Sequence, residues 1–449
     1  MRGRVLLCSC SLMAALAAPV RAEEPTGRVY TLEELVDSAM SRNAEIAQGA
    51  WKVAGARAVL RQARAARLLP RLRLDSENGL VPDARGNVFG TLDDSTGFFR
   101  SLGPFNRTEL EFVQPLYTFG QLTNLGRAAT GGVAVEEAAL DEKRAEVTLA
   151  VKKLYYGLLL AQDLRDLAAK LATKLAEKQA ELAGRESLSL ANGYKLKLAM
   201  IELAERRREA EEKVTLARAA LAWQTGLPED APLMLADEWL APVEAAVPPL
   251  PELIAAAEAN RPDWRRLQAG LAARQAQYRA ARGAFYPQVY LAGGVRYATA
   301  PGRTDQHNPF VKDEFNYFNA GLFVGVRQSF EWGLLGAEAD KTRAAYEELK
   351  TRERDAGRAL ALDVRRAYAE YQRADLDQAS ADESRHLARQ WLQEAQSEYE
   401  LDPDTLKDLV TAFETWARLE QAFHEAVYHR NLKLAELEKT AGGVALKRP

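Results

Sequence analysis

The two longest patterned stretches of the sequence carry apolar residues at alternating spacings of four and three, which is typical of a helix buried along one stripe. One stretch runs from residue 121 to about 186 without a proline, and the other runs from about 334 to 400. The stripes are Val147, Val151, Leu154, Leu158 and Ala161, and then Leu360, Val364, Ala367, Tyr371 and Ala374. A helix of roughly 65 residues is about 100 Å long. The pattern predicts a long, tubular molecule, and it fits a dimeric coiled coil as well as a barrel of helices.

Two further regions alternate with period two, as strands do when one face is polar and the other apolar. We expect strand hairpins at about 71–118 and 287–331. One face of the first hairpin is charged and one face of the second is apolar. The charged face begins with Arg71, Arg73, Asp75 and Glu77, and the apolar faces hold Val289, Leu291, Gly293, Val295 and Tyr297 with Phe318, Ala320, Leu322, Val324 and Val326. This alternation predicts outer-membrane strands around a water-filled lumen, although a half-exposed soluble sheet gives the same pattern.

Similar segments recur about 213 residues apart, in the same order, which indicates an internal repeat. Examples are Val151-Lys152-Lys153-Leu154-Tyr155 and Val364-Arg365-Arg366-Ala367-Tyr368. We predict a first repeat over 23–227, with long helix 121–186 and helix 192–226, then an equatorial linker over 228–250. The second repeat covers 251–440, with long helix 334–400 and helix 403–440, and a tail covers 441–449. Each repeat opens with a helix, and the first is expected to run without a break from its N-cap at Thr31 to about Leu69.

The first 22 residues have the order of a secretory signal peptide. Arg2 and Arg4 precede an apolar run over residues 5–18, and small residues end the segment at Ala22. The run is shorter than the roughly 18 apolar residues that a membrane anchor needs. Both cysteines, Cys8 and Cys10, lie inside the segment, so the mature chain would contain none. Because no later segment reads as a helical span, any membrane crossing must use strands.

Composition excludes several classes of function. The chain has 449 residues, 60 Lys+Arg against 63 Asp+Glu and a net charge of -3, which disfavours a dedicated nucleic-acid binder. The four histidines are scattered, and no nucleophile elbow, phosphate loop or metal motif occurs, so we expect no enzyme, cofactor or metal. One basic stripe stands out on the first helix, and we interpret it as a solvated or lumen-facing surface near the membrane junction. It consists of Arg57, Arg61, Arg64, Arg67 and Arg71.

The number of strands has a consequence for assembly. Two hairpins supply four strands, whereas membrane barrels must close and begin at about eight strands. One chain is therefore too small to form the membrane unit, and several copies must share one barrel. The long helices that follow each hairpin would then form a helical tube below it.

A set of loose motifs recurs in a fixed order: Thr31-Leu32-Glu33-Glu34-Leu35, Leu69-Pro70, Gln114-Pro115-Leu116-Tyr117-Thr118-Phe119-Gly120, Gln224-Thr225-Gly226-Leu227 and residues 399–412. With these motifs, the order of parts resembles the TolC-like outer-membrane efflux protein (outer membrane factor) family over essentially the whole mature chain. The resemblance implies a mixed α and membrane-β fold, in which a long α-helical barrel continues into a transmembrane β-barrel. Four strands per chain would be closed by trimerisation into about twelve strands. It further implies outer-membrane localisation with a periplasmic helical extension.

The resemblance also assigns residues at the periplasmic end. Tyr399 matches a tyrosine that ends the last long helix in the family, and Asp408 falls on an acidic ring that constricts the entrance. Asp404 stands where, in the family, a basic residue can form a gate link, and the internal repeat aligns Asp408 with Lys195. We hypothesise that Lys195 and Asp408 alternate around the closed entrance, against the alternative of a solvated charged turn. Residues crowding the two turns are candidate adaptor contacts, namely Arg185, Glu186, Tyr194, Glu398 and Lys407.

The implied function is a passive exit duct of a tripartite efflux or type I secretion system, docked by a periplasmic adaptor and an inner-membrane pump. The competing interpretation is a soluble periplasmic coiled-coil scaffold or adaptor without a channel. Adaptors share long helical hairpins but lack a duplicated strand pair. The exported compound, whether drug, metal ion or polypeptide, has no signature in the residues.

Overall fold

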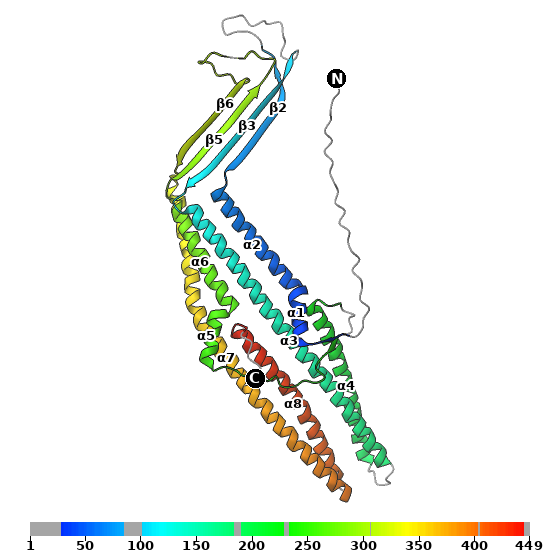
Figure 1. Cartoon of the computed structure of the whole chain (residues 1–449). Coiled ribbons are helices and arrows are strands. Elements are labelled where there is room, and N and C mark those ends of the chain that lie inside the picture. Colours follow the sequence, from blue (N-terminus) through cyan, green and yellow to red (C-terminus); the bar gives the residue numbers. More distant parts are fainter. Residues whose placement is uncertain are drawn as a thin grey trace.

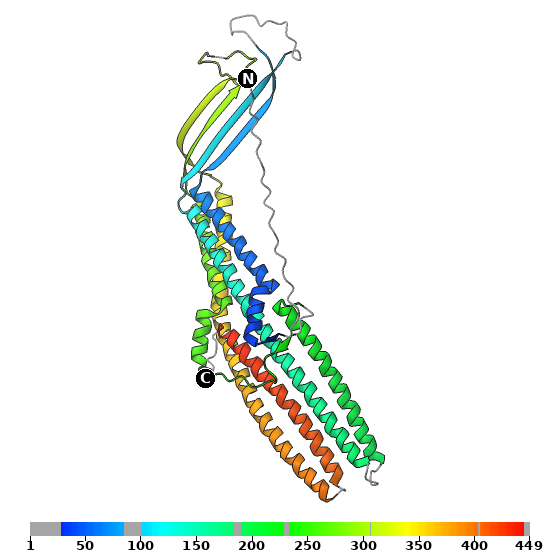
Figure 2. The same ribbon diagram turned by 45° about the vertical axis from the view of Figure 1, so that its right-hand side comes forward.

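Four very long helices and one sheet make up most of the chain, as a computed structural model shows (Figure 1). The structure describes residues 28–84, 101–183, 190–228, 233–305, 307–402 and 405–443. The sheet lies at one end, and the helices extend from it in a single elongated layer (Figures 1 and 2). The predicted signal peptide lies outside the described residues.

The long helices follow the predicted apolar stripes. Helix α3 spans Gln121–Ala183 and α4 spans Leu190–Thr225, and the corresponding pair is α7 at Trp332–Leu401 and α8 at Leu406–Thr440. In each stripe four of the five residues are buried. Val151 and Val364 are each 0% exposed. The stripes are thus contacts between helices, as the spacing of four and three requires. The same order of elements stands on both sides of residues 228–250, and the exact repeat boundaries stay a prediction.

The first helix of each half is broken, so the prediction of one continuous helix to about Leu69 is wrong. The first half has α1 at Leu32–Arg42 and α2 at Ala44–Leu68, separated by Asn43 in an extended conformation. The Asn43 side chain accepts from Glu45 N at 2.9 Å and donates to Gln224 O at 2.9 Å. Asn43 is therefore an N-cap that also ties the break to α4.

The second half has the same break for a different reason. Helix α5 at Leu250–Asn260 and α6 at Pro262–Gly283 meet at Arg261, which is extended. Pro262 occupies the first turn of α6, and a proline disfavours helical geometry in the residue before it. The chain can therefore change direction at Arg261.

The larger sheet contains the two predicted hairpins. Among the described residues its order is β2-β3-β5-β6, antiparallel throughout. Its strands are β2 at Arg71–Pro82, β3 at Leu102–Tyr117, β5 at Gln288–Thr299 and β6 at Tyr317–Arg327. The second hairpin was predicted to extend to residue 331, but β6 ends at Arg327 and α7 already begins at Trp332.

Part of the predicted equatorial linker forms regular structure and packs on the helices. Its β4, Met234–Leu235, pairs in parallel with β1, Val29–Tyr30, at the start of the described chain. Asn431 on α8 accepts from Val243 N at 2.9 Å and donates to Ala241 O at 2.8 Å. The side chain of Asn431 thus satisfies backbone groups of the equatorial segment, where prolines prevent regular strand pairing.

The lateral order of helices defines two edges of the layer. Near the sheet, α3 packs between α2 and α6, and α6 packs against α7. At the other end, α3 packs between α4 and α8, and α8 packs against α7. Helices α2 and α4 therefore form one edge, and α7 forms the other along its whole length.

A close approach of α3 to α6 gives a test of this packing. A Cβ on Gly131 would meet the Cβ of Ala273 at 2.8 Å and its backbone Cα at 3.0 Å, whereas one on Gly132 meets nothing within 4 Å. We expect Gly131→Ala to lower the free energy of unfolding by about 1–3 kcal/mol. Gly132→Ala should be neutral or raise it by up to ~1 kcal/mol, because alanine is the better helix former. Denaturant titration of both variants in detergent would contradict the packing if their effects were equal.

Candidate functional site

One face of the sheet carries a network of ion pairs between strands. Arg107 on β3 bonds to Glu77 on β2, with Nη2 and Oε2 2.6 Å apart. Arg296 on β5 lies 3.1 Å from Glu111 and 3.9 Å from Glu109, both on β3. These side chains are partly exposed, so each pair contributes little by itself. Together they place charges of alternating sign along a solvated surface. This surface is the charged face that the alternation in the first hairpin predicted.

The opposite face is apolar and uncovered. Leu72 and Leu74 on β2 are 67% and 66% exposed, and Leu322 and Val324 on β6 are 67% and 65% exposed. On β5 the apolar positions run from Val289 to Tyr297, which at 3.3 Å per residue is about 26 Å. With a strand tilt of about 40°, this run would rise about 20 Å, most of the height of the apolar band of outer-membrane strands, about 25 Å. An apolar surface of this size requires a cover of lipid or protein.

Aromatic side chains gather at the two ends of this apolar face. At the helical end, Phe119 lies 4.7 Å from Tyr117 and stacks on Tyr286 at 5.4 Å between ring centroids. Phe119 has a φ of 48° and precedes Gly120 at 85°, so the tight turn from β3 into α3 holds the ring in place. At the other end, Tyr297 and Phe318 are 45% and 68% exposed. Such girdles mark the two interfaces of membrane strands.

The edges of the sheet and of the helical layer are open. Among the described residues, β2 and β6 each have a partner strand on one side only. The edge helices also expose large apolar residues: Leu198, Ile201, Leu216 and Trp223 on α4, and Leu362, Leu376, Leu387 and Trp391 on α7. In the single chain, both the described sheet and the helical layer therefore end in edges that expose groups able to pair or pack.

The helix ends that flank the two predicted gate turns, those of α3 and α4 and those of α7 and α8, lie at the same end of the molecule, far from the sheet (Figures 1 and 2). Tyr399 is only 3% exposed, so it belongs to the packing of α7 and not to an open surface. Asp408 lies exposed in the first turn of α8, next to exposed Lys407. Lys195 lies within α4. Asp404 is outside the described residues, so the gate assignment stays a prediction.

The predicted adaptor contacts are only partly described. Tyr194 is 64% exposed in the first turns of α4, and Glu398 is exposed near the end of α7. The Glu398 carbonyl accepts from Asp402 N at 2.8 Å, which closes the helix end. Arg185 and Glu186 lie outside the described residues. The contact role of all these residues stays a prediction.

A buried polar network beside the equatorial segment was not predicted. Asp163 on α3 accepts from Leu240 N at 3.0 Å, and His424 Nδ1 lies 3.2 Å from the same oxygen, Oδ2. Tyr155, also on α3, donates a hydrogen bond to Asp237 at 2.7 Å. The pKa of Tyr155 is raised, mainly by burial and secondly by this hydrogen bond. The feature of the sequence that could have indicated this network is Asp163, an acidic residue on the apolar side of a long helix. A buried acidic side chain is rarely left without a partner.

An ion-pair cluster joins α7 to α8 and predicts an acid response. Hydrogen bonds from Lys433 at 2.8 Å and from Arg366 at 2.8 Å lower the pKa of Glu370 from 4.5. A lowered carboxylate pKa stabilises the fold above 4.5, and the gain is lost as pH falls through the folded-state value.

We therefore expect Glu370→Gln to be less stable than wild type at pH 7 by less than ~1 kcal/mol, since the group is partly exposed. The difference should shrink as pH falls from about 5 to 3. Thermal melting across this range is the measurement, with Glu353→Gln on the same helix as control. A difference that stayed constant with pH would contradict the assignment.

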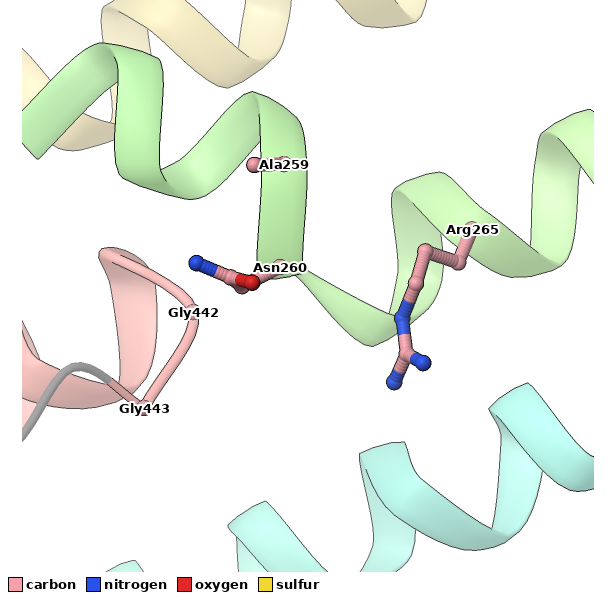
Figure 3. Close-up of a pocket in the computed structure, with 5 residues that line it drawn as sticks. All are labelled: Ala259, Asn260, Arg265, Gly442 and Gly443. Carbon is pink, nitrogen blue, oxygen red and sulfur yellow. The ribbon is translucent and has the colours of Figure 1, made fainter.

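A hollow of about 460 Å³ lies between the end of α5 and the turn after α8 (Figure 3). Its lining includes Arg265, whose guanidinium already bonds to Asp141 at 2.8 Å. Gly442 lines it with a φ of 86°, and a Cβ there would meet Asn260 Cβ at 2.9 Å. The hollow is a junction where α8 ends against α5. In the part of the chain that the structure describes, no three metal-binding side chains cluster.

No helix among the described residues combines the length and apolar character needed to span a bilayer.

Comparison with known proteins agrees with this geometry. The outer membrane efflux protein family matches residues 35–187 and 253–443, and the chain belongs to that family. The two matched ranges fall on either side of the equatorial segment. The family places the protein in the outer membrane and its role in efflux.

Relatives support the same fold. The pyoverdine export outer membrane protein OpmQ of Pseudomonas aeruginosa is 29% identical over 187 residues, which is 41% of this chain and 36% of that protein. The outer membrane protein VceC of Vibrio cholerae superposes with a TM-score of 0.75 at 17% identity, covering 92% of this chain and 96% of that one. The open state of the MtrE channel of Neisseria gonorrhoeae gives 0.73 at 20% identity, covering 93% and 90%.

Proposed function

We propose that three copies of this chain form an outer-membrane channel that acts as a passive exit duct. Each copy supplies four strands to a closed transmembrane barrel and one third of the circumference of a periplasmic helical tube. The observation that carries this is the four-stranded sheet with one charged face, one exposed apolar face and two edges that have no further partner strand within the described residues. A sheet in lipid must leave no edge open, so other copies must supply the missing strands.

The direction of assembly follows from the two different edges. Strand β2 of one copy would pair with β6 of the next, and the α2–α4 edge would pack on the α7 edge. Such a head-to-tail contact closes into a ring when the rotation between copies is right. The exposed leucines and tryptophans of α4 and α7 would be buried in this seam.

The charged sheet face would then line the lumen. Mixed charges steer a permeating solute by their field but recognise little, so we place substrate selection with an inner-membrane pump and its periplasmic adaptor. The N-terminal segment would direct the chain across the inner membrane. The two helical tips, which lie farthest from the sheet, are the surface for the adaptor.

The test is fractionation followed by electrophysiology of the full chain. We expect the protein in outer-membrane fractions, extractable only with detergent, with the mass of a trimer and discrete conductance steps in planar bilayers. Release by osmotic shock as a soluble monomer or dimer would instead indicate a periplasmic scaffold. A membrane-bound trimer that shows no conductance even when the proposed gate is opened by Lys195→Glu would contradict the duct.

The gate proposal predicts a charge effect on conductance. Lys195→Glu would place acidic groups against Asp408 and open the resting entrance, so we expect higher conductance than wild type. The exchange Lys195→Glu with Asp408→Lys should restore a closed entrance, because such weak pairs depend on opposite sign. Unchanged single-channel conductance in Lys195→Glu would contradict the gate.

A further inference from the structure

Segments that carry basic but no acidic residues lie on α2, α6 and the start of α3 next to the sheet, whereas the start of α7 carries both signs. Residues 46–74, which include most of α2, contain no Asp or Glu, and neither do residues 264–304, which include most of α6. Helix α3 between them has no acidic residue before Glu136. Yet acidic residues slightly outnumber basic ones in the whole chain, 63 to 60. The basic residues of the two segments are Lys52, Arg57, Arg61, Arg64, Arg67, Arg71, Arg73, Arg265, Arg266, Arg274, Arg279, Arg282, Arg296 and Arg303.

Three arginines of this region are exposed in the single chain, on a helix that also forms one of its edges. Arg61, Arg64 and Arg67 on α2 are exposed, and no acidic side chain pairs with them in the described parts of the chain. Arg57, one turn lower, differs because it bonds to Glu137 on α3 at 2.7 Å. We call Arg61, Arg64 and Arg67 the α2 arginine stripe.

The stripe ends at the membrane boundary. Arg67 is next to the last residue of α2, and its carbonyl accepts from Gln114 on β3 at 3.2 Å. Seven residues of helix separate Arg61 from Leu68, about 10 Å, which is close to one Debye length at physiological salt. The apolar sheet face begins with Leu72 on the following strand.

An exposed leucine shows which environment the stripe faces. Leu68 is 65% exposed and lies four residues after Arg64 and seven after Arg61, so it shares their side of the helix. Leu69 beside it is 59% exposed. Leucine toward the sheet with arginine one turn below is the arrangement of a lipid boundary, where apolar groups meet acyl chains and cations meet headgroups. Exposure of these leucines to a water-filled lumen would not stabilise the protein.

We infer that the α2 arginine stripe binds the phosphate headgroups of anionic phospholipids in the leaflet next to the periplasm. The inference rests on the proposed function, because it requires the sheet to be embedded in a bilayer. Guanidinium groups bond phosphate oxygens in pairs and stay charged at every physiological pH, which suits this role. The stripe would hold the channel at a fixed depth.

The test compares lipid retention by the full-length trimer. Wild type is exchanged into nanodiscs of equal phosphatidylglycerol and phosphatidylcholine, and the lipids that stay bound after bilayer removal are counted by native mass spectrometry. We expect enrichment of phosphatidylglycerol in wild type and its loss in Arg61→Gln/Arg64→Gln/Arg67→Gln. Each basic residue near an anionic surface is worth a factor of about five, so the triple variant should lose about a hundredfold.

The matched control is another arginine triplet on an exposed helix. Arg206→Gln/Arg207→Gln/Arg208→Gln lies on α4 away from the sheet, where Arg206 and Arg207 pair with Glu202 and Glu211. It should keep full enrichment. The inference is overturned if wild type shows no enrichment, or if the stripe variant keeps it. It is also overturned if the variant alters only the reversal potential of the channel, which would place the stripe in the lumen. Failure of wild type to enter any bilayer would instead refute the proposed function.

Discussion

Leu322→Arg is expected to prevent stable insertion of the sheet into the outer membrane. Leu322 lies at the middle of β6, is 67% exposed and pairs with Gly293 across the apolar face. An arginine at the lipid-facing midplane costs about 2–4 kcal/mol. Three copies in one barrel would triple that cost to ~6–12 kcal/mol, which is comparable to the stability of an ordinary domain. Heat-resistant trimer in outer-membrane fractions, quantified by semi-native electrophoresis, should fall to a small fraction of the wild-type amount.

The neighbouring residue supplies the control. Phe323 lies on the charged face, opposite Ala292, and is also largely exposed at 57%. Phe323→Arg introduces the same charge into a solvated surface, so trimer yield should stay near wild type while conductance changes. Equal yields from the two arginine variants would show that the face carrying Leu322 does not meet lipid. The assignment of the two faces would then be wrong.

Asp163→Ala should produce the largest loss of stability among single changes in the helical layer. The carboxylate is the only acceptor that the described structure gives Leu240 N, and it also lies 3.2 Å from His424 Nδ1. Removing it leaves a buried donor unpaired and creates a cavity, at a combined cost of about 2–4 kcal/mol. We expect a lower unfolding midpoint and faster proteolysis within residues 233–250, which the network ties to α3 and α8.

A second aspartate on the same helix separates this effect from a general loss of charge. Asp166 pairs with Arg165 at 2.7 Å, but its side chain is 52% exposed. Asp166→Ala should change stability by less than about 1 kcal/mol, because solvent screens exposed pairs. A similar loss in both variants would mean that the equatorial segment does not depend on Asp163. Asp163→Asn should show an intermediate loss, since the amide oxygen still accepts from Leu240.

The long helices and the hairpins could be predicted because their signals are local. Val147 to Ala161 repeat at coiled-coil spacing wherever the partner lies, and Arg71 to Glu77 alternate in any strand. The breaks at Asn43 and Arg261 were less visible. The Asn43 cap depends partly on a carbonyl of α4, and the apolar spacing continues across both breaks. A stripe alone therefore suggested one helix where the structure has two.

The candidate site divides in the same way. Leu322 and the charged face could be assigned from alternation, since a strand fixes which residues share a face. Asp163 could not, because its partners Leu240 and His424 are brought to it by the packing of three distant segments. His424 had no neighbouring histidine at a useful spacing and carried no signal of its own. Tyr399 matched a family motif, yet the structure buries it.

The sequence by itself determined the periods of burial, the four strands of the larger sheet and the basic segments without acidic residues on α2 and α6, since each depends only on neighbours along the chain. The short strands β1 and β4 were not predicted. Only the tertiary structure decided that α2, α4 and α7 are edges, that β2 and β6 are the edge strands of the described sheet, and that α3 and α8 hold the equatorial segment. Those contacts join residues far apart in the chain. Their energy depends on which surfaces meet, and no local pattern records that choice.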